Sequence, residues 1–442
     1  MQKEMMVTSL YDGISCGQIT LERAGIQPSH SHDLLNLNYF IRPHEWAVFL
    51  FLSYLFSLSI CDFQNLVQKT YFFPFSGKLK MFTSVSFRRK SMQEKFIVVS
   101  LFDGISCGHV ALERAGISVD QYYASEIEPS AIRITQKNYP NTVQIGDITK
   151  VKYNSETGLL TCENGEFSIE KIDLVIGGSP CTDLSSIGYA KGMISDAIEI
   201  KSLDQYLKLK ESEANFTGQS YLFWEYMRLI HEIHPKYFLL ENVVMSKKWR
   251  AVINEAIGME PLQINSSLVS AQNRPRLYWT NIPNVSVPED KNIFLDDILS
   301  DSASTDDVSH CQTVKKCFPK LQAKYGYIPS KFNAYNCSEI NQKACALSRG
   351  SMVTSSCASL IFVPVENGVH TVKNGILNDL YKTKLPDGNY NIRKLSITEM
   401  ERLQTLPDGY TEVPNVGIQK RSSAIGNAWT VDVISHILRH IR

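Results

Sequence analysis

The sequence predicts an α/β fold with a doubly wound, mostly parallel sheet, and three observations support this. Short apolar runs alternate with amphipathic segments from residue 96 onward, which is the pattern of strands connected by helices. Several apolar runs end at a glycine or an acidic residue, as strands do when they lead into a ligand-binding turn. The chain has 442 residues, of which 43% are hydrophobic and 20% charged, so it can bury a large core.

The first part of this pattern predicts strands whose carboxyl ends meet at one edge of the sheet. Gly104 and Gly108, after the first strand, let the backbone come close to a ligand. Glu126 is placed like the ribose-binding acid of nucleotide folds, and Asp147 can accept a hydrogen bond from an adenine amine. The alternative is a tight turn with acids that cap helices, since no complete G-x-G-x-x-G is present. The predicted strands are 97–102, 122–127 and 142–148, and the predicted helices are 109–115 and 129–138.

Three later segments place reactive side chains at strand ends. The apolar run 172–177 directly precedes Cys181, and the predicted strand 237–243 carries Glu241. Arg274 and Arg276 occupy alternate positions leading into another strand, which predicts that both guanidinium groups lie on one side. A free cysteine taken alone is usually a buried structural residue. The glutamate and the arginines favour a nucleophile instead.

A thiolate, a carboxylic acid and a guanidinium together suit methylation of cytosine at C5. Cytosine C5 is too weak a nucleophile to attack a methyl donor, but addition of a thiolate at C6 makes C5 enamine-like. A carboxylic acid at N3 and a guanidinium at O2 then stabilise the charge that develops. We expect a helix N-terminus and Arg274 to lower the pKa of Cys181.

The beginning of the chain is duplicated. Residues 1–26 repeat as residues 92–117, with 17 identities in 26 positions at a constant offset of 91. A repeat fold needs several stacked units, so we interpret residues 1–95 as a partial duplication followed by unpatterned sequence, with the catalytic unit beginning near Met92. The apolar run 46–60 is shorter than the roughly 20 residues of a membrane span and does not lie at the start of the chain, as a signal peptide would. A short membrane-associated segment is the alternative.

Composition restricts the partners. The formal net charge is +0, so a polyanion would have to be bound by a local patch. The ten cysteines include no C-x-x-C, and the five from Cys311 to Cys357 do not fit a zinc ribbon or finger. We therefore expect no metal, and reduced thiols in a cytoplasmic enzyme.

Six ordered segments resemble the motifs of the C5-cytosine DNA methyltransferases. The resemblance covers residues 96–442, and the wording of several motifs is similar to phage enzymes and to the catalytic domain of mammalian de novo methyltransferases. It implies a Rossmann-like, S-adenosylmethionine-dependent fold with a smaller target-recognition domain. The segments are LFDGISCG at 101–108, GGSPC at 177–181, ENV at 241–243, QNRPR at 272–276, RKLSITEMERLQTLPDGY at 393–410 and AIGNAW at 424–429.

The resemblance also implies residue roles. Cys181 would be the nucleophile, Glu241 the acid at N3 and Arg274 the contact to O2, with Gln272 and Arg276 in support. Trp429 is assigned to the cofactor pocket by the resemblance alone, since such a residue can equally be core. The residues expected to bind S-adenosylmethionine are Phe102, Asp103, Gly104, Ile105, Ser106, Cys107, Glu126, Asp147, Ile148, Pro180, Asn427, Ala428 and Trp429.

The domains follow from the same motifs. Residues 96–283 would form the catalytic domain, 284–415 the target-recognition domain and 416–442 the return to the catalytic domain. The polar insertion 194–214 is expected to be a solvated helical excursion, with a role in DNA contact as the alternative.

The expected partner is double-stranded DNA, from which the target cytosine is flipped out. A cognate restriction endonuclease or a phage self-protection role fits the resemblance, and we expect a monomer. A tRNA-modifying branch shares this architecture, so RNA methylation is an alternative, and a non-catalytic S-adenosylmethionine- or DNA-binding regulator is another. The long segment after residue 284 favours DNA, and the presence of Cys181, Glu241 and Arg274 argues against a regulator. The duplicated start also leaves open an inactive gene product.

Overall fold

The computed structural model describes residues 95–184, 192–196, 198–349 and 353–441. The first copy of the duplicated start and the apolar run 46–60 lie outside these residues. Within the described part of the chain, no helix combines the length and apolar character that a membrane span requires.

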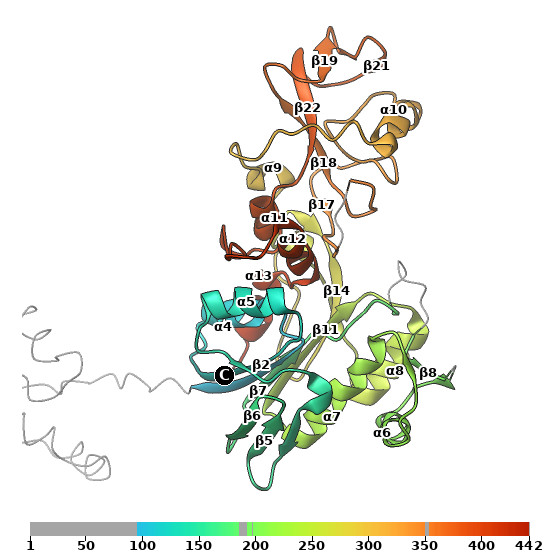
Figure 1. Cartoon of the computed structure of the whole chain (residues 1–442). Helices are drawn as coiled ribbons and strands as arrows, with labels where there is room; N and C mark the ends of the chain where they lie inside the picture. The colour runs from blue at the N-terminus through green and yellow to red at the C-terminus, as the bar shows by residue number, and fades with distance from the viewer. Residues whose placement is uncertain (1–94, 185–191, 197, 350–352, 442) are drawn as a thin grey trace, which may run out of the picture. The chain divides into compact units, whose positions relative to one another are not determined.

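A seven-stranded sheet forms the centre of the catalytic part (Figure 1). Its spatial order is β12-β14-β11-β7-β1-β2-β3. Only β14 runs antiparallel to its neighbours, so the predicted mostly parallel sheet is confirmed. The strands are β1 (Phe96–Leu101), β2 (Val119–Ser125), β3 (Val143–Gln144), β7 (Leu174–Gly177), β11 (Tyr237–Val243), β12 (Leu262–Asn265) and β14 (Pro275–Thr280).

The strand order reverses between β1 and β7. The chain moves outward from β1 through β2 and β3, and then returns to the other side of β1. Leu101 and Gly177 are register partners at the carboxyl ends of β1 and β7, so the turns that follow both strands open side by side. Open α/β sheets bind ligands at this position.

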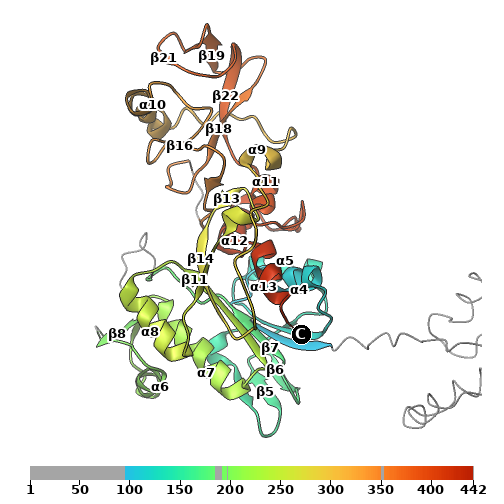
Figure 2. The ribbon, with the colours of Figure 1, turned by 180° about the vertical axis from the view of Figure 1, so that it is seen from behind.

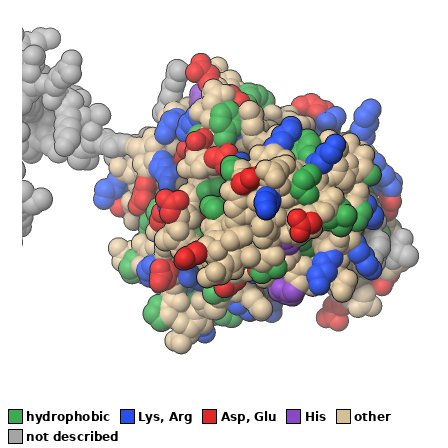
Figure 3. Space-filling model, turned by 90° about the horizontal axis from the view of Figure 1, so that it is seen from above, with side chains coloured by type: hydrophobic (Ala, Val, Ile, Leu, Met, Phe, Trp, Pro, Cys, Tyr) green, Lys and Arg blue, Asp and Glu red, His purple; other side chains and the backbone are tan. Residues whose placement is uncertain are grey.

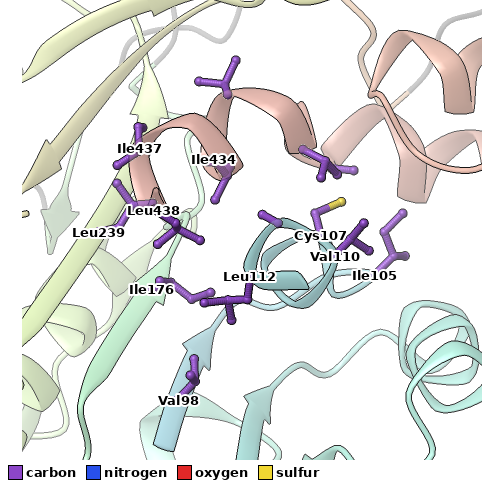
Figure 4. Packing of buried hydrophobic residues seen from close by; sticks show 14 of the residues in the cluster. Val98, Ile105, Cys107, Val110, Leu112, Ile176, Leu239, Ile434, Ile437 and Leu438 are labelled. Atoms are coloured by element: carbon purple, nitrogen blue, oxygen red, sulfur yellow. The ribbon is translucent and has the colours of Figure 1, made fainter. Parts of the chain in front are cut away.

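Helices cover both faces of the sheet, as Figures 1 and 2 show. Val98 and Val99, adjacent in β1, belong to different apolar clusters because successive strand residues point to opposite faces. In Figure 4, Val98, Leu112 and Ile434 lie in the cluster between the sheet, α4 and α13. The helices of this face are α4 (Cys107–Ala115), α5 (Pro129–Asn138) and α13 (Val431–Leu438), and those of the other face are α7 (Phe223–Ile233) and α8 (Lys247–Ile257).

Most predicted elements agree with the structure, and one is shorter. The helix 129–138 and the strand 237–243 have the predicted bounds. The predicted strand 142–148 is only β3, because Gly146 has φ 71° and the Asp147 side chain caps the 3-10 turn η1 (Ile148–Lys150). Asp147 therefore lies in a turn next to the end of β3.

The inserted segment is a helix with a buried inner face. It contains α6 (Leu203–Glu211), in which Tyr206 is 1% exposed, and Ile200 before it is fully buried. The expectation of a helix is confirmed, but the expectation of a solvated excursion is wrong for this face, because its apolar side chains pack into the cluster that α7 also joins. The short elements around it are β8 (Ile194–Ser195), β9 (Ile198–Glu199), β10 (Phe216–Thr217) and η2 (Ser220–Leu222).

A second seven-stranded sheet lies within the predicted target-recognition segment. Its order is β16-β15-β18-β22-β19-β20-β21, its pairs are antiparallel, and α10 (Gln312–Tyr325) packs on its apolar cluster. Basic and acidic side chains are interspersed on the face shown in Figure 3, in keeping with a net charge of +0. The strands are β15 (Lys331–Asn333), β16 (Ser338–Glu339), β18 (Leu360–Pro364), β19 (His370–Lys373), β20 (Ile376–Leu377), β21 (Tyr381–Lys382) and β22 (Gly388–Lys394).

The chain returns to the catalytic core after this sheet. Leu406 and Tyr410, ahead of residue 416, already belong to the apolar cluster of α4 and α13. The remaining elements are β4 (Lys152–Asn154), β5 (Leu159–Cys162), β6 (Gly165–Ser168), η3 (Ser266–Leu268), β13 (Gln272–Asn273), β17 (Ala344–Cys345), α9 (Leu295–Ile298), α11 (Ile397–Leu403) and α12 (Ile418–Asn427).

Candidate active site

Cys181 lies in the loop that follows β7. Asn242, at the end of the neighbouring strand β11, donates from Nδ2 to Ser179 Oγ at 3.0 Å and is 1% exposed. On the other side of Cys181, the Asp183 carboxylate accepts from the backbone N–H of Gln219 at 2.9 Å. The loop is therefore held on both sides of the thiol, which positions Cys181 at the carboxyl edge of the sheet.

Glu241 sits in β11 with both carboxylate oxygens occupied. Oε1 lies 2.9 Å from Arg276 Nε on the antiparallel strand β14, and Oε2 accepts from Trp429 Nε1 at 3.0 Å. A Cβ on Gly178 would lie 2.8 Å from Trp429 Nε1 and 3.0 Å from Glu241 Oε2. The loop of Cys181 thus passes so close to Trp429 and Glu241 that a side chain at position 178 would displace one of them.

Arg274 has different partners from Arg276. Its guanidinium is 4% exposed and donates to three backbone carbonyls, those of Leu347 at 2.6 Å, Gly426 at 3.2 Å and Ala428 at 3.0 Å. The predicted strand alternation does not extend to it, because β13 ends at Asn273 and β14 begins at Pro275. Burial, followed by the charge of Arg276, lowers the pKa of Arg274 to about 9.

Gln272 is part of a buried polar network. Its Nε2 donates to Leu403 O at 2.5 Å and to Gln404 Oε1 at 2.8 Å, and its Oε1 accepts from Leu347 N at 3.3 Å. Thr430 Oγ1 donates to the same Gln404 oxygen at 2.9 Å. These bonds join the arginine segment to α11, to the segment that follows β17 and to the start of α13.

The electrostatic surroundings of Cys181 differ from the expectation. Burial and then the negative charge of Glu241 raise the pKa of Cys181, and the charges of Arg276 and Arg274 oppose this. The expected lowering is wrong for two reasons. Residues 182–184 form a turn, where a helix N-terminus was expected, and desolvation outweighs the two arginines.

The turn after β1 has an unusual backbone. Phe102, Gly104 and Ser106 all have φ between 56° and 62°, so alternate residues of the turn are left-handed. The Asp103 N–H donates to Ser125 O at 3.0 Å, at the end of β2. Glu126 Oε2 accepts from Gly104 N at 2.8 Å, which fixes the turn to the end of β2. Asp103 accepts from the Tyr122 hydroxyl at 2.8 Å and from Ser106 Oγ.

The carboxylate of Glu126 is held in place by backbone donors. Oε1 accepts from Ile127 N and from Glu128 N, each at 2.8 Å, and burial raises the pKa of Glu126. Beside it, Ile127 is 66% exposed. An ordered acid next to an exposed apolar side chain fits a nucleoside, whose ribose is polar and whose base is flat and apolar.

The other predicted cofactor residues are placed in three ways. Asp147 Oδ1 accepts from Thr149 N at 2.9 Å, and Ile148 follows it in η1. The side chains of Ile105 and of Cys107, the first residue of α4, are 1% and 3% exposed and belong to the apolar cluster around this helix (Figure 4), so only their backbone can face a ligand. Burial raises the pKa of Cys107 to about 12. Half-buried Pro180 precedes Cys181, exposed Asn427 ends α12, and Ala428 is 7% exposed.

Comparison with known proteins identifies the family of the chain. The model of the C-5 cytosine-specific DNA methylase family matches residues 96–442. The chain belongs to this family. Among the residues that the structure describes, no group of three His, Cys, Asp or Glu side chains could hold a metal ion.

Individual methylases of this family match at low identity. The orphan methyltransferase M.SPRI of Bacillus phage SPR is 26% identical over 201 residues, which cover 42% of this chain and 38% of that protein. The type II methyltransferase M.NgoPII of Neisseria gonorrhoeae is 25% identical over 368 residues, or 78% of this chain and 95% of that protein. The structure of Entamoeba histolytica methyltransferase EhMeth has a TM-score of 0.52 at 12% identity, covering 79% of this chain and 98% of that one. The similarity to the EhMeth structure shows a shared fold.

Sequence reasoning missed several residues that organise the methylase site. Asn242 stands inside the ENV segment, and only its neighbour Glu241 was assigned a role. The two consecutive glycines before Ser179 indicated a close backbone approach at Gly178. The residue that approaches, Trp429, lies 251 positions away in the chain, so the sequence did not identify it. Gln404 and Thr430 gave no signal, because polar residues near helix ends are usually caps.

Proposed function

We propose that the chain is a DNA (cytosine-5-)-methyltransferase that acts through a covalent bond between Cys181 Sγ and cytosine C6. The observation that carries this proposal is the Glu241 carboxylate, held between Arg276 and Trp429 against the loop of Cys181. A nucleophile, an acid and a cation then lie together at the carboxyl edge of the sheet, where all three could contact one bound nucleobase.

Each residue performs a separate step. Cys181 adds to C6 as a thiolate, and Glu241 holds a proton at N3, so that the ring does not accumulate negative charge. Bound S-adenosylmethionine supplies an electrophilic methyl group on its sulfonium. Once C5 carries the methyl group, a base from solvent takes the C5 proton, and the electron pair of that C–H bond forms the C5–C6 double bond and expels Cys181 as a thiolate.

We propose that Arg276, and not Arg274, faces O2 of the base. Three of the five N–H groups of Arg274 donate to the carbonyls of Leu347, Gly426 and Ala428, so this guanidinium cannot turn to a substrate without leaving three buried acceptors unpaired. Arg276 already contacts the carboxylate of Glu241. Arg274 and Gln272 then support the site by joining its segments.

We propose that S-adenosylmethionine binds at the switch point of the sheet. Glu126 would accept from the ribose hydroxyls, Asp147 and the backbone of Ile148 would bind adenine, and the backbone of 103–107 would approach the methionine part. Ile127 would cover the base, and Trp429 would close the pocket from the end of the chain.

Double-stranded DNA is the proposed substrate because the second sheet presents an independent surface with a basic helix. Lys316, Lys320 and Lys324 are exposed and lie on one face of α10, since they are four residues apart. Cations at this spacing can follow a phosphate backbone. RNA is the alternative substrate.

The setting we propose is cytoplasmic, with the enzyme acting as a monomer. One relative is a type II methyltransferase and another is an orphan phage methyltransferase. The type II relative suggests restriction–modification with a cognate endonuclease, and the phage relative suggests phage self-protection.

A trapping experiment tests this function. A duplex that contains 5-fluorocytosine should form a permanent adduct with the full chain and S-adenosylmethionine, because fluorine at C5 blocks the release of Cys181. Mass spectrometry should find the adduct on Cys181, Cys181→Ala should bind the cofactor without an adduct, and 5-fluorocytosine in tRNA should not react. An adduct on another residue overturns the mechanism, an adduct with tRNA alone changes the substrate, and binding of both ligands without any adduct indicates a regulator or an inactive product.

A further inference from the structure

The inserted helix α6 shares a buried carboxylate with α7. Glu225 of α7 is fully buried, and its Oε1 accepts from the Tyr206 hydroxyl and from Lys210 Nζ, both on α6. Its Oε2 accepts from Arg228 Nε at 2.8 Å. A buried carboxylate is tolerated only when it is paired, so these contacts fix α6 to α7.

The two cations on Glu225 also bind the turn that follows Asp147. Arg228 Nη2 donates to Val151 O at 2.7 Å and to Ile148 O at 3.2 Å. Lys210 Nζ donates to Thr149 O at 3.4 Å. Three carbonyls of one short turn therefore accept from charges that meet at a single carboxylate.

This turn is the one proposed to bind adenine. Asp147 Oδ1 accepts from Thr149 N at 2.9 Å, so a rotation of the peptide at Thr149 also moves the carboxylate of Asp147. Lys210 contacts the Thr149 carbonyl, which belongs to the next peptide unit, whereas the carbonyl of the peptide that carries the Thr149 N–H is Ile148 O, which accepts from Arg228. The inserted helix is thus connected to the Asp147 carboxylate through two hydrogen bonds that share Thr149.

We propose that Lys210 is a positioning residue for the adenine end of S-adenosylmethionine, and that the inserted segment sets the affinity for this cofactor through Glu225 and the Thr149 carbonyl. The inference rests on the proposed function, because it assumes that Asp147 and Ile148 bind adenine.

Loss of Lys210 should be tolerated by the fold. The side chain of Lys210 is 35% exposed, and Glu225 keeps Arg228 and Tyr206 when the lysine is removed. No unpaired buried charge results, and ion pairs of partly exposed lysines contribute little to stability. An effect on affinity can then be separated from an effect on folding.

The experiment measures cofactor affinity in the full chain. Lys210→Met should raise the Kd for S-adenosylmethionine and S-adenosylhomocysteine in titration calorimetry by about fivefold to tenfold, the change expected for one lost hydrogen bond. The KM for S-adenosylmethionine should rise in parallel, while kcat and the KM for DNA stay within about twofold. Tyr206→Phe, which removes only the hydroxyl on Glu225, should shift Kd in the same direction by a smaller factor.

Two variants serve as controls, and the outcomes are distinct. Lys210→Arg retains a donor and should restore most of the affinity, and Lys208→Met, exposed on the same helix, should leave Kd unchanged. Equal Kd values for wild type and Lys210→Met would refute the positioning role, as would a joint loss of kcat, DNA affinity and melting temperature. A wild-type chain that binds no S-adenosylmethionine would instead overturn the proposed function, and this inference with it.

Discussion

Arg276 Nε lies 2.9 Å from Glu241 Oε1, whereas the guanidinium of Arg274, two residues earlier, donates to three backbone carbonyls. The two arginines of one short motif therefore have different duties. Arg276 contacts the carboxylate of Glu241, and we propose that it is part of the chemical site. Through these three carbonyls, Arg274 connects the end of α12 and the segment that follows β17 to the catalytic sheet.

The first prediction separates these duties. Arg276→Gln should lower kcat by about 10²-fold to 10³-fold with little change in melting temperature, because it removes a charge beside the reacting base. Arg274→Gln should destabilise the fold by about 3 kcal/mol, because three buried acceptors lose a charged donor. Steady-state kinetics and urea unfolding of both variants check this. A stable Arg274→Gln with the larger loss of kcat would reverse the assignment.

The second prediction concerns the thiol. Burial and Glu241 raise the pKa of Cys181, so its alkylation by iodoacetamide should increase about tenfold per pH unit from pH 7 upward without a plateau at neutral pH. Glu241→Gln removes the negative charge beside the thiol. At about pH 7.5, Cys181 of this variant should therefore be alkylated faster than Cys181 of the wild type, whereas methyl transfer should be lost. Peptide mass spectrometry follows Cys181 itself. A plateau near pH 6 would mean that the pKa is lowered instead.

Gly178→Ala is the third prediction. Its Cβ would meet Trp429 Nε1 at 2.8 Å and Glu241 Oε2 at 3.0 Å, and both neighbours belong to the site. The displaced carboxylate should reduce kcat by about 10²-fold, since small misplacements of catalytic groups are costly. Gly417→Ala, which meets nothing within 4 Å, is the matched control. Full activity of Gly178→Ala would show that the loop has room to move.

The fourth prediction is a pH dependence of stability. His109 stacks on Tyr139 at 3.8 Å and Tyr122 at 4.7 Å, its Nδ1 is buried without a partner among the described residues, and burial lowers its pKa from 6.5 to about 4. The unfolded chain binds the proton more tightly, so the stability associated with the neutral ring is present above pH 6.5 and is lost as the pH falls towards 4.

The loss amounts to at most about 3 kcal/mol. His109→Phe keeps the stacking and removes the titration. The difference in unfolding free energy between wild type and His109→Phe should therefore change in favour of the variant as the pH drops from 6.5 to 4. A difference that does not vary with pH would contradict the burial of a neutral ring.

The fifth prediction concerns DNA. Replacing Lys316, Lys320 and Lys324 with glutamine should weaken binding of all duplexes equally and reduce the slope of log K against log salt by about 2 to 3, because each phosphate contact contributes about 0.9. Lys152→Gln, an exposed lysine in β4, should leave the slope unchanged. An unchanged slope in the triple variant would place the DNA elsewhere.

The sequence by itself determined the architecture and the family, and it predicts the reactive groups. Alternating apolar and amphipathic segments are local patterns, so β11 and α5 were predicted with their observed bounds. The family followed from six ordered motifs, because each is a contiguous string of residues. Cys181 and Glu241 follow from the ends of their strands, and parallel strands bring such ends together.

The tertiary structure decided what contacts what. The duties of Arg274 and Arg276 depend on carbonyls of Leu347, Gly426 and Ala428, which lie between 73 and 154 positions away in the chain. The direction of the pKa shift of Cys181 depends on burial, which no local pattern reports. The inner face of α6 is buried because its apolar side chains pack with those of α7, and Glu225, fifteen residues beyond Lys210, accepts from this helix. Long-range contacts of polar groups have no sequence period, so only the folded chain reveals them.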